Sequence, residues 1–272
     1  MLISSCASGE DLRKIETPPE ALTAGAGPQK TALPLFGRKL RIPLWRELPP
    51  GVENIPVLTI ELELVDLAGD PEGRFYHNAL YRGLSVQDYA EELARAQTAE
   101  YQEMGEEALN NSLLIRSASL NWSYTEQFDV LMSSARILVI SRNRFFYSGG
   151  AHGAYDTVYF VFDRKPAARI RLADILQEEF RPALKQLVNR ELRINKELDP
   201  GDSLKKAMFF VDEADLSENF FFSPQGIGFH WDPYEIAPYV EGDVEAVVSF
   251  AELEPLLNSR GRELIQELRG EI

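Results

Sequence analysis

The chain has 272 residues, and its 28 basic and 43 acidic side chains give a formal net charge of −15. Nucleic acids are held by lysines and arginines that neutralise phosphates, so this balance argues against a nucleic-acid partner and favours a cationic one. An acidic surface also serves solubility alone, so the charge does not identify a partner by itself. No apolar run approaches the roughly 20 residues that span a bilayer, and "ILVI" at 137–140 has the length of a strand.

The only cysteine, Cys6, lies in the opening segment "MLISSC". This segment resembles the end of a bacterial lipoprotein signal, although it is too short to hold the charged and apolar regions of a full signal. The segment that follows is rich in Pro, Gly, Ala and Thr, a composition typical of a flexible tether. We therefore expect residues 1–33 to be a signal remnant and tether, with lipidation at Cys6 as the only membrane attachment. The alternative is a chance match near a disordered end.

The first elements are a strand and a long helix. "IPVLTIELELVDL" at 55–67 predicts the strand, and residues 85–108 predict the helix, with Ser85 and Asp88 as a capping pair. A clear alternation then places large apolar side chains on one strand face: Leu120, Trp122, Tyr124, Phe128 and Val130. Glu126 interrupts this face, which indicates a bulge, a sheet edge or a buried pair. "SSARILVISRNRFFYS" predicts the next strand, antiparallel to this one.

The second half of the chain also begins with a strand, "AYDTVYFVFD" at 154–163. "LADIL" and "RPALKQLVNRELRINKEL" predict helices, "ENFFFSPQGIGFHW" predicts a hairpin, and "VEAVVSF" predicts the last strand. Ser249 and Glu252 form a capping box for a C-terminal helix, which Pro255 should interrupt or limit to a short first piece.

Strands outnumber helices in this reading, and most connections are short. The pattern predicts an α+β fold with antiparallel sheets and packed helices. We expect two small modules in tandem, at residues 34–147 and 148–272, after the tether.

The glycine-rich segment "YSGGAHGAYD" at 147–156 separates two apolar runs. Gly149, Gly150 and Gly153 permit positive φ angles, so the segment predicts a sharp turn between two strands. We interpret His152 within this turn as structural rather than catalytic, satisfying a backbone group or a neighbouring carboxylate.

A second unusual loop is "WDPYEIAPY" at 231–239, where Pro233 and Pro238 stiffen the backbone and tyrosines offer amphipathic surface. It is either an extended connection packed on a sheet or a binding rim. We expect this loop and the glycine turn to meet in space, with the His152 ring and the Glu235 carboxylate within hydrogen-bonding reach or sharing a backbone partner. The candidate ligand-binding residues are His152, Tyr155, Tyr234, Glu235 and Tyr239.

The familiar catalytic motifs are missing from the sequence. It contains no nucleophile elbow, phosphate-binding loop, zinc-protease motif or dinucleotide fingerprint. His77, His152 and His230 are far apart and lack the spacing of metal ligands. We therefore predict no catalytic residue, no metal and no cofactor.

Two separated motifs carry a resemblance to a known family. "FFYSGGAHGAYDTVYFVFD" followed by "RIRLADIL", and later "FFFSPQGIGFHWDPYEIAPYVEG" with "VVSFAELEPLL", resemble the C-terminal extracytoplasmic domain shared by the RsiV anti-sigma factor and the PdaC deacetylase. Asp232 stands where that family usually has Asn. The element order over about 55–145 is similar to the companion N-terminal module, so the resemblance covers about 55–257.

The resemblance implies a role outside the cytoplasm. In RsiV-like anti-sigma factors this region binds lysozyme, and in the deacetylase it precedes a separate catalytic domain. We therefore expect a non-enzymatic binding or sensing domain of the cell envelope, periplasmic or on the outer surface. Its partner would be a cationic protein such as lysozyme, or peptidoglycan.

Two alternatives stay open, so the sequence does not decide whether the chain is an enzyme. The first is an enzyme that acts on cell-wall glycan through two carboxyl groups about 5–10 Å apart. The second is a purely structural envelope lipoprotein.

Overall fold

The computed structural model describes residues 34–47, 54–110 and 120–271. The expected lipidation at Cys6 and the expected tether lie outside the described residues. The described residues all belong to one compact unit, Thr31–Ile272. Among its described residues, no helix combines the length and the apolar character needed to cross a bilayer.

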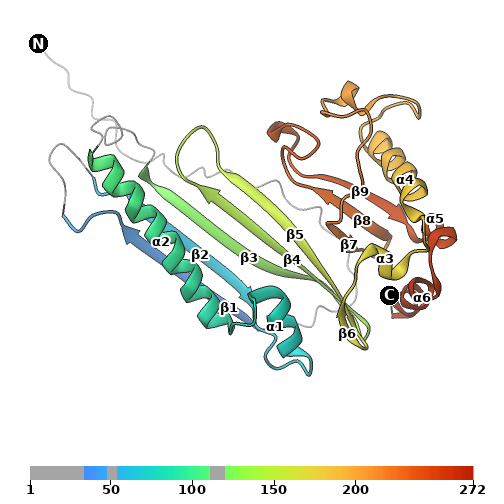
Figure 1. The fold of residues 1–272 in the computed structure, drawn as a ribbon, viewed down its shortest axis with the longest axis horizontal. Coiled ribbons are helices and arrows are strands. Elements are labelled where there is room, and N and C mark those ends of the chain that lie inside the picture. Colours follow the sequence, from blue (N-terminus) through green and yellow to red (C-terminus); the bar gives the residue numbers. More distant parts are fainter. Residues whose placement is uncertain (1–33, 48–53, 111–119, 272) are drawn as a thin grey trace, which may run out of the picture. The chain divides into compact units, whose positions relative to one another are not determined.

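A six-stranded sheet forms the first layer (Figure 1). Its strands lie in chain order: β1 (Leu35–Pro43), β2 (Val57–Val65), β3 (Trp122–Ser133), β4 (Ile137–Tyr147), β5 (Ala154–Arg164) and β6 (Ala167–Arg169). All neighbours are antiparallel except β2 and β3, which are parallel. The two helices between these strands, α1 (Gly73–Tyr81) and α2 (Val86–Asn110), provide the crossover that a parallel pair requires.

The helices α1 and α2 cover one face of the sheet (Figure 1). In β2, the buried residues Leu58, Ile60, Leu62 and Leu64 alternate with partly or fully exposed ones, so β2 presents one apolar face to this core. Ser85 caps α2 as expected, because its hydroxyl accepts a hydrogen bond from the Asp88 amide at 3.0 Å.

A smaller antiparallel sheet and four helices build the second layer. The sheet contains β7 (Phe220–Phe222), β8 (Gly226–Trp231) and β9 (Val244–Ser249). The helices are α3 (Leu172–Ile175), α4 (Phe180–Asn195), α5 (Phe250–Leu253) and α6 (Ser259–Glu271). Short 3₁₀ helices lie at Leu204–Ala207 (η2), Tyr239–Glu241 (η3) and Glu254–Leu256 (η4).

Strand β4 contributes to both cores. Leu138 and Ile140 are buried in the core under α1 and α2, whereas Ile137 and Val139 are buried in the core of the second layer. The large sheet is therefore covered on both faces at this end. A side-chain clamp reinforces the junction: the fully buried Asp163 of β5 accepts hydrogen bonds from Arg136 at 2.7 Å and from Arg260 of α6 at 3.0 Å.

The predicted α+β class is confirmed, and the exception to antiparallel pairing is the β2–β3 pair. The capping box of Ser249 and Glu252 is confirmed, and the helix that it starts is short, because η4, which contains Pro255, follows α5 directly. The predicted boundary at 147/148 falls between β4 and β5, which are neighbours in one sheet. The division into two sequence modules stays a prediction.

Glu126 shows why the apolar face of β3 carries a charge. Its carboxylate is buried and accepts hydrogen bonds from the Tyr89 hydroxyl at 2.6 Å and the Tyr124 hydroxyl at 2.5 Å. Burial, and then the neighbouring Glu126 charge, raise the pKa of Tyr124. The buried carboxylate is thus satisfied by two donors, as a buried charge requires, and the buried-pair interpretation holds.

Candidate functional site

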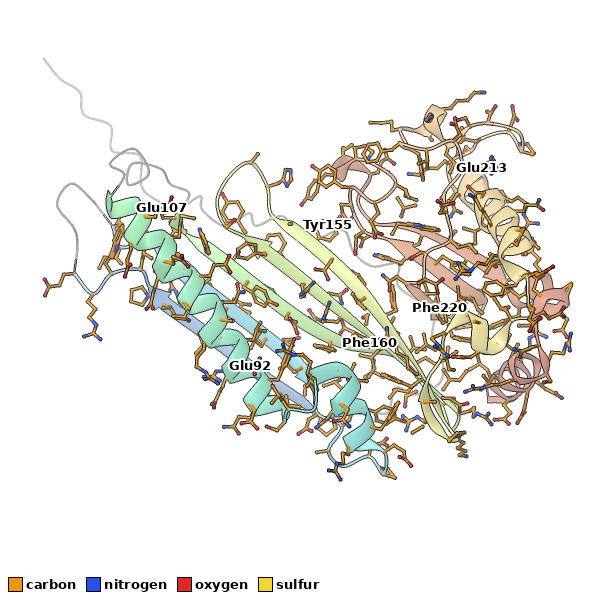
Figure 2. The ribbon with its side chains drawn as sticks, in the orientation of Figure 1. Glu92, Glu107, Tyr155, Phe160, Glu213 and Phe220 are labelled. Carbon is orange, nitrogen blue, oxygen red and sulfur yellow. The ribbon has the colours of Figure 1, made fainter. Side chains whose placement is uncertain are left out.

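The glycine turn and the "DPYEIAPY" loop meet in space, as predicted. The ring of His152 stacks on that of Tyr239, with centroids 4.0 Å apart and planes 20° from parallel. Tyr155 meets Tyr239 edge-on at 5.7 Å, and Tyr234 lies 5.9 Å from Tyr239. We call these four residues the aromatic cluster. Figure 2 labels Tyr155 near the start of β5, beside the turn that carries His152.

The predicted hydrogen bond between His152 and Glu235 is wrong. The Glu235 carboxylate accepts instead from the Asp232 amide at 2.8 Å. The Nδ1 atom of His152 lies 2.8 Å from the Gly153 carbonyl, and its Nε2 lies 3.5 Å from the Tyr234 hydroxyl. The physical reason is local. The Glu235 carboxylate accepts the hydrogen bond that closes its own tight turn, so it is directed to the Asp232 amide and not to His152.

Glycine is required in the turn that presents His152. Gly149 and Gly150 have φ angles of 93° and 104°, a region that side chains disfavour. A Cβ at Gly153 would lie 2.5 Å from the ring of Phe145. The interpretation of this segment as a difficult turn between strands is therefore correct, and the turn delivers His152 to the tyrosines.

Part of the aromatic cluster is open to solvent. Tyr234 is 57% exposed, and Val240, which follows Tyr239 in the chain, is 77% exposed. Tyr234 also has a φ of 72°, which is unusual for a bulky residue. Tyr155 is half-buried, and burial together with the negative charge of Asp243 raises its pKa to about 12. A strained backbone that presents an exposed ring is a frequent feature of functional loops.

A polar cluster surrounds His230, which was not among the predicted site residues. His230 in β8 is fully buried. Its Nδ1 lies 3.1 Å from a Glu245 oxygen, and its Nε2 lies 3.1 Å from an Asp232 oxygen and 4.0 Å from an Asp243 oxygen. Burial alone lowers the pKa of His230, but the hydrogen bonds to Asp232 and Glu245 outweigh it and raise the pKa to about 9. His230 is therefore an imidazolium at neutral pH.

The His230 cluster is tied to β5 by further hydrogen bonds. The Tyr159 hydroxyl donates to Glu245 at 3.0 Å, and the Thr157 amide donates to Asp232 at 2.8 Å. The Asn219 side chain accepts from the Tyr159 amide and donates to the Thr157 carbonyl. These bonds satisfy backbone groups of β5 where it faces the second layer, so the cluster joins the two sheets.

A signal for this cluster was present in the sequence. His230 and Asp232 are two residues apart, as are Asp243 and Glu245, a spacing that places both members of a pair on one side of an extended segment. In the structure, Asp232 directly follows β8 and Asp243 directly precedes β9. The register of β8 and β9 then places His230 opposite Glu245. Only the pairing of the two strands brings the pairs together.

Among the described residues, His230, Asp232 and Asp243 present ligand atoms within 4.8 Å of one another, so they could hold a cation. The Nε2–Asp232 distance already fits a hydrogen bond, and we interpret the group as a charged imidazolium among carboxylates. The three histidines are not brought together: Nε2 of His77 accepts from the Leu67 amide in the other core.

Comparisons with known proteins find a family match in the second layer. Residues 173–251 match the family model described as a protein of unknown function (DUF3298). These residues run from α3 into α5 and include the whole "DPYEIAPY" loop. No curated protein matches the chain.

Two solved structures share the fold. A member of the DUF3298 family from Bacteroides fragilis superposes with a TM-score of 0.69 at 22% identity, covering 86% of this chain and 96% of that one. A DUF3298 family protein from Pseudomonas aeruginosa superposes with a TM-score of 0.52 at 19% identity, covering 84% and 95%. At these identities the likeness establishes the fold. The chain thus has a match to the DUF3298 model over residues 173–251 and a fold similar to that of two DUF3298 proteins.

Proposed function

We propose that this chain is a non-enzymatic binding module of the cell envelope and that the aromatic cluster is its recognition surface. The observation that carries the proposal is the presentation of Tyr234, a 57% exposed residue with a left-handed backbone, beside the stacked pair of His152 and Tyr239. Core packing does not require this arrangement. Tyrosine is enriched at binding hot spots because it offers a large, rigid and amphipathic contact area.

An adjoining segment carries further exposed apolar side chains. Met208 and Phe210 are 57% and 50% exposed. The Phe210 amide donates to the Ile236 carbonyl at 2.9 Å, which fixes this segment against the "DPYEIAPY" loop. Exposed apolar groups that gather on adjoining segments mark interaction sites more often than scattered ones do.

The location and the partner are supported by the sequence resemblance. The motifs shared with the RsiV and PdaC proteins fall on the two loops that form the aromatic cluster. In that family the domain works outside the cytoplasm, which agrees with the lipoprotein-like start. The net charge of −15 favours a cationic protein such as lysozyme, and peptidoglycan is the second candidate ligand.

One observation favours the carboxylate enzyme as a second candidate. Asp232 and Asp243 present oxygens within 4.8 Å of each other, close to the spacing of about 5 Å used by retaining glycosidases. However, the Asp232 oxygen near His230 already accepts two hydrogen bonds, from the Thr157 amide and from the His230 ring. We therefore favour the binding module.

The experiment measures the affinity of the chain for lysozyme and for soluble peptidoglycan fragments by calorimetry. We expect one of the two to bind, and the variant Tyr234→Ala/Tyr239→Ala to bind at least tenfold more weakly. Leu131→Ala is the matched control, because Leu131 is also an exposed apolar residue, on β3. Failure of both ligands to bind, or equal binding by the double variant, would contradict the proposal. Release of reducing sugar ends that is lost in Asp243→Asn would support the enzyme instead.

A further inference from the structure

We propose that Asp243, with the rings of Tyr155 and Tyr239, forms a receptor for a lysine or arginine side chain of a partner protein. The inference rests on the proposed function, because it names the chemistry that the aromatic cluster accepts. The observation behind it is a carboxylate near an aromatic side chain that forms no ion pair with a lysine or arginine among the described residues.

The carboxylates of the segment 235–245 differ in whether a positive charge or a hydrogen-bond donor neutralises them. Glu241 forms an ion pair with Lys196. Glu235 accepts from a backbone amide, and Glu245 lies 3.1 Å from the His230 ring. Each of these has a short partner within the chain.

Asp243 is the carboxylate of this segment that lacks such a short partner among the described residues. Its only ion-pair contact in the part of the chain that the structure describes is with His230 at 4.0 Å, too long for a hydrogen bond. Burial raises its pKa, and the charges of Asp232 and Glu245 add to this effect, although His230 opposes it. His230 carries a single positive charge among three carboxylates, so the group keeps an excess of negative charge. A further cation would relieve this repulsion.

The Tyr155 side chain lies near this charge, and burial together with this charge raises the pKa of Tyr155. A Cβ at Gly242, the residue before Asp243, would lie 3.5 Å from the Tyr155 hydroxyl. Tyr155 in turn contacts Tyr239 edge-on. Ammonium and guanidinium groups bind to aromatic faces as well as to carboxylates, and they gain most where water is partly excluded. The side chain of Asp243 is 38% exposed, so a group from solvent can reach it.

Among the described residues, the basic side chains that flank this segment are engaged elsewhere. Lys196 is paired with Glu241 and lies over the ring of Phe209. Arg144 of β4 is paired with Asp156 at 2.7 Å. Among the described residues, no lysine or arginine forms an ion pair with Asp243. The occupant that fits the charge is therefore a basic side chain supplied from outside, in line with the acidity of the whole chain.

The test uses methylguanidinium and butylammonium chloride as probes and the 272-residue chain in NMR titrations. We expect saturable shifts of the amides of Tyr155, Tyr239, Gly242 and Asp243, and no such shifts with methylurea or butanol, the neutral counterparts. Asp243→Asn should weaken the apparent affinity at least fivefold. Asp215→Asn removes the same charge from a fully solvated site and should leave the affinity within twofold.

Three results would overturn the inference. The first is the absence of saturable shifts. The second is equal weakening by Asp243→Asn and Asp215→Asn, which would reduce the effect to general charge. The third is zinc binding that displaces the probes and is lost in Asp243→Asn, which would assign the site to a metal ion.

The proposed function has a separate readout. Lysozyme or peptidoglycan binding that needs Tyr234 and Tyr239 but is unchanged by Asp243→Asn would keep the binding surface and remove the cation receptor.

Discussion

The charge of His230 predicts a stability loss at alkaline pH. Its pKa is about 9 in the folded chain, against an ordinary value of 6.5. Because the folded pKa is the higher one, the contribution of His230 is fully present below pH 6.5 and is lost as pH rises through 9. At about 1.4 kcal/mol for each pH unit between the two values, the contribution is on the order of 3 kcal/mol.

The assay is urea unfolding of the wild-type chain and of His230→Gln at intervals from pH 6 to pH 9.5. We expect the wild type to lose about 3 kcal/mol of unfolding free energy relative to the variant across this range. Glutamine keeps a hydrogen-bond donor but cannot carry the charge that faces Asp232, Asp243 and Glu245. His152→Gln is the control, because His152 is exposed and should follow the wild type.

An independent measurement on the wild-type chain tests this prediction even if His230→Gln fails to fold. An NMR titration of the wild-type chain should show the His230 ring changing protonation near pH 9. Titration near pH 6.5 in the folded chain, or parallel stability curves for wild type and His230→Gln, would refute the imidazolium interpretation.

Three substitutions test the packing around the sheets by urea unfolding. Asp163→Asn should lower the free energy of unfolding by about 3 kcal/mol, because it leaves Arg136 without its buried anion. A loss below about 1 kcal/mol would show that this ion pair does not stabilise the junction. Tyr89→Phe should cost about 1–3 kcal/mol by removing a donor from a buried carboxylate, and an unchanged midpoint would show that carboxylate to be solvated. Gly226→Ala should cost at least about 1–3 kcal/mol, because its Cβ would lie 2.0 Å from the Val248 carbonyl oxygen; Gly201→Ala, with open space around it, is the control.

Elements with strong periodicity were predictable. The strand at 55–67 and the helix at 85–108 correspond to β2 at Val57–Val65 and α2 at Val86–Asn110. One face of each element packs against a core, so the spacing of its apolar residues distinguishes a strand from a helix.

Among the elements that the sequence did not predict, β1 and α1 were missed for physical reasons. Strand β1 is an edge strand whose residues alternate between exposed and half-buried, so its pattern is weak. Helix α1 has no side-chain cap at Glu72 and ends at Arg82 in the left-handed conformation, where glycine is usual. The local signals that mark a helix are therefore missing from α1.

The candidate site was predictable in its position but not in its contacts. The two loops stood out because of their glycines, prolines and tyrosines, and they do meet. Which residue faces His152 depends on the turn that directs Glu235 to the Asp232 amide and leaves Tyr239 to stack on the imidazole. The His230 cluster depends on the register between β8 and β9, which the spacing within each strand does not determine.

The most direct test of the recognition surface is hydrogen–deuterium exchange of the chain with and without saturating lysozyme, or with the peptidoglycan fragment if that is the ligand that binds. The account predicts slower exchange in two separated segments, residues 149–155 and 232–243, because the aromatic cluster is built from both. Protection confined to other surfaces, such as α2 or the β1 edge, would contradict it.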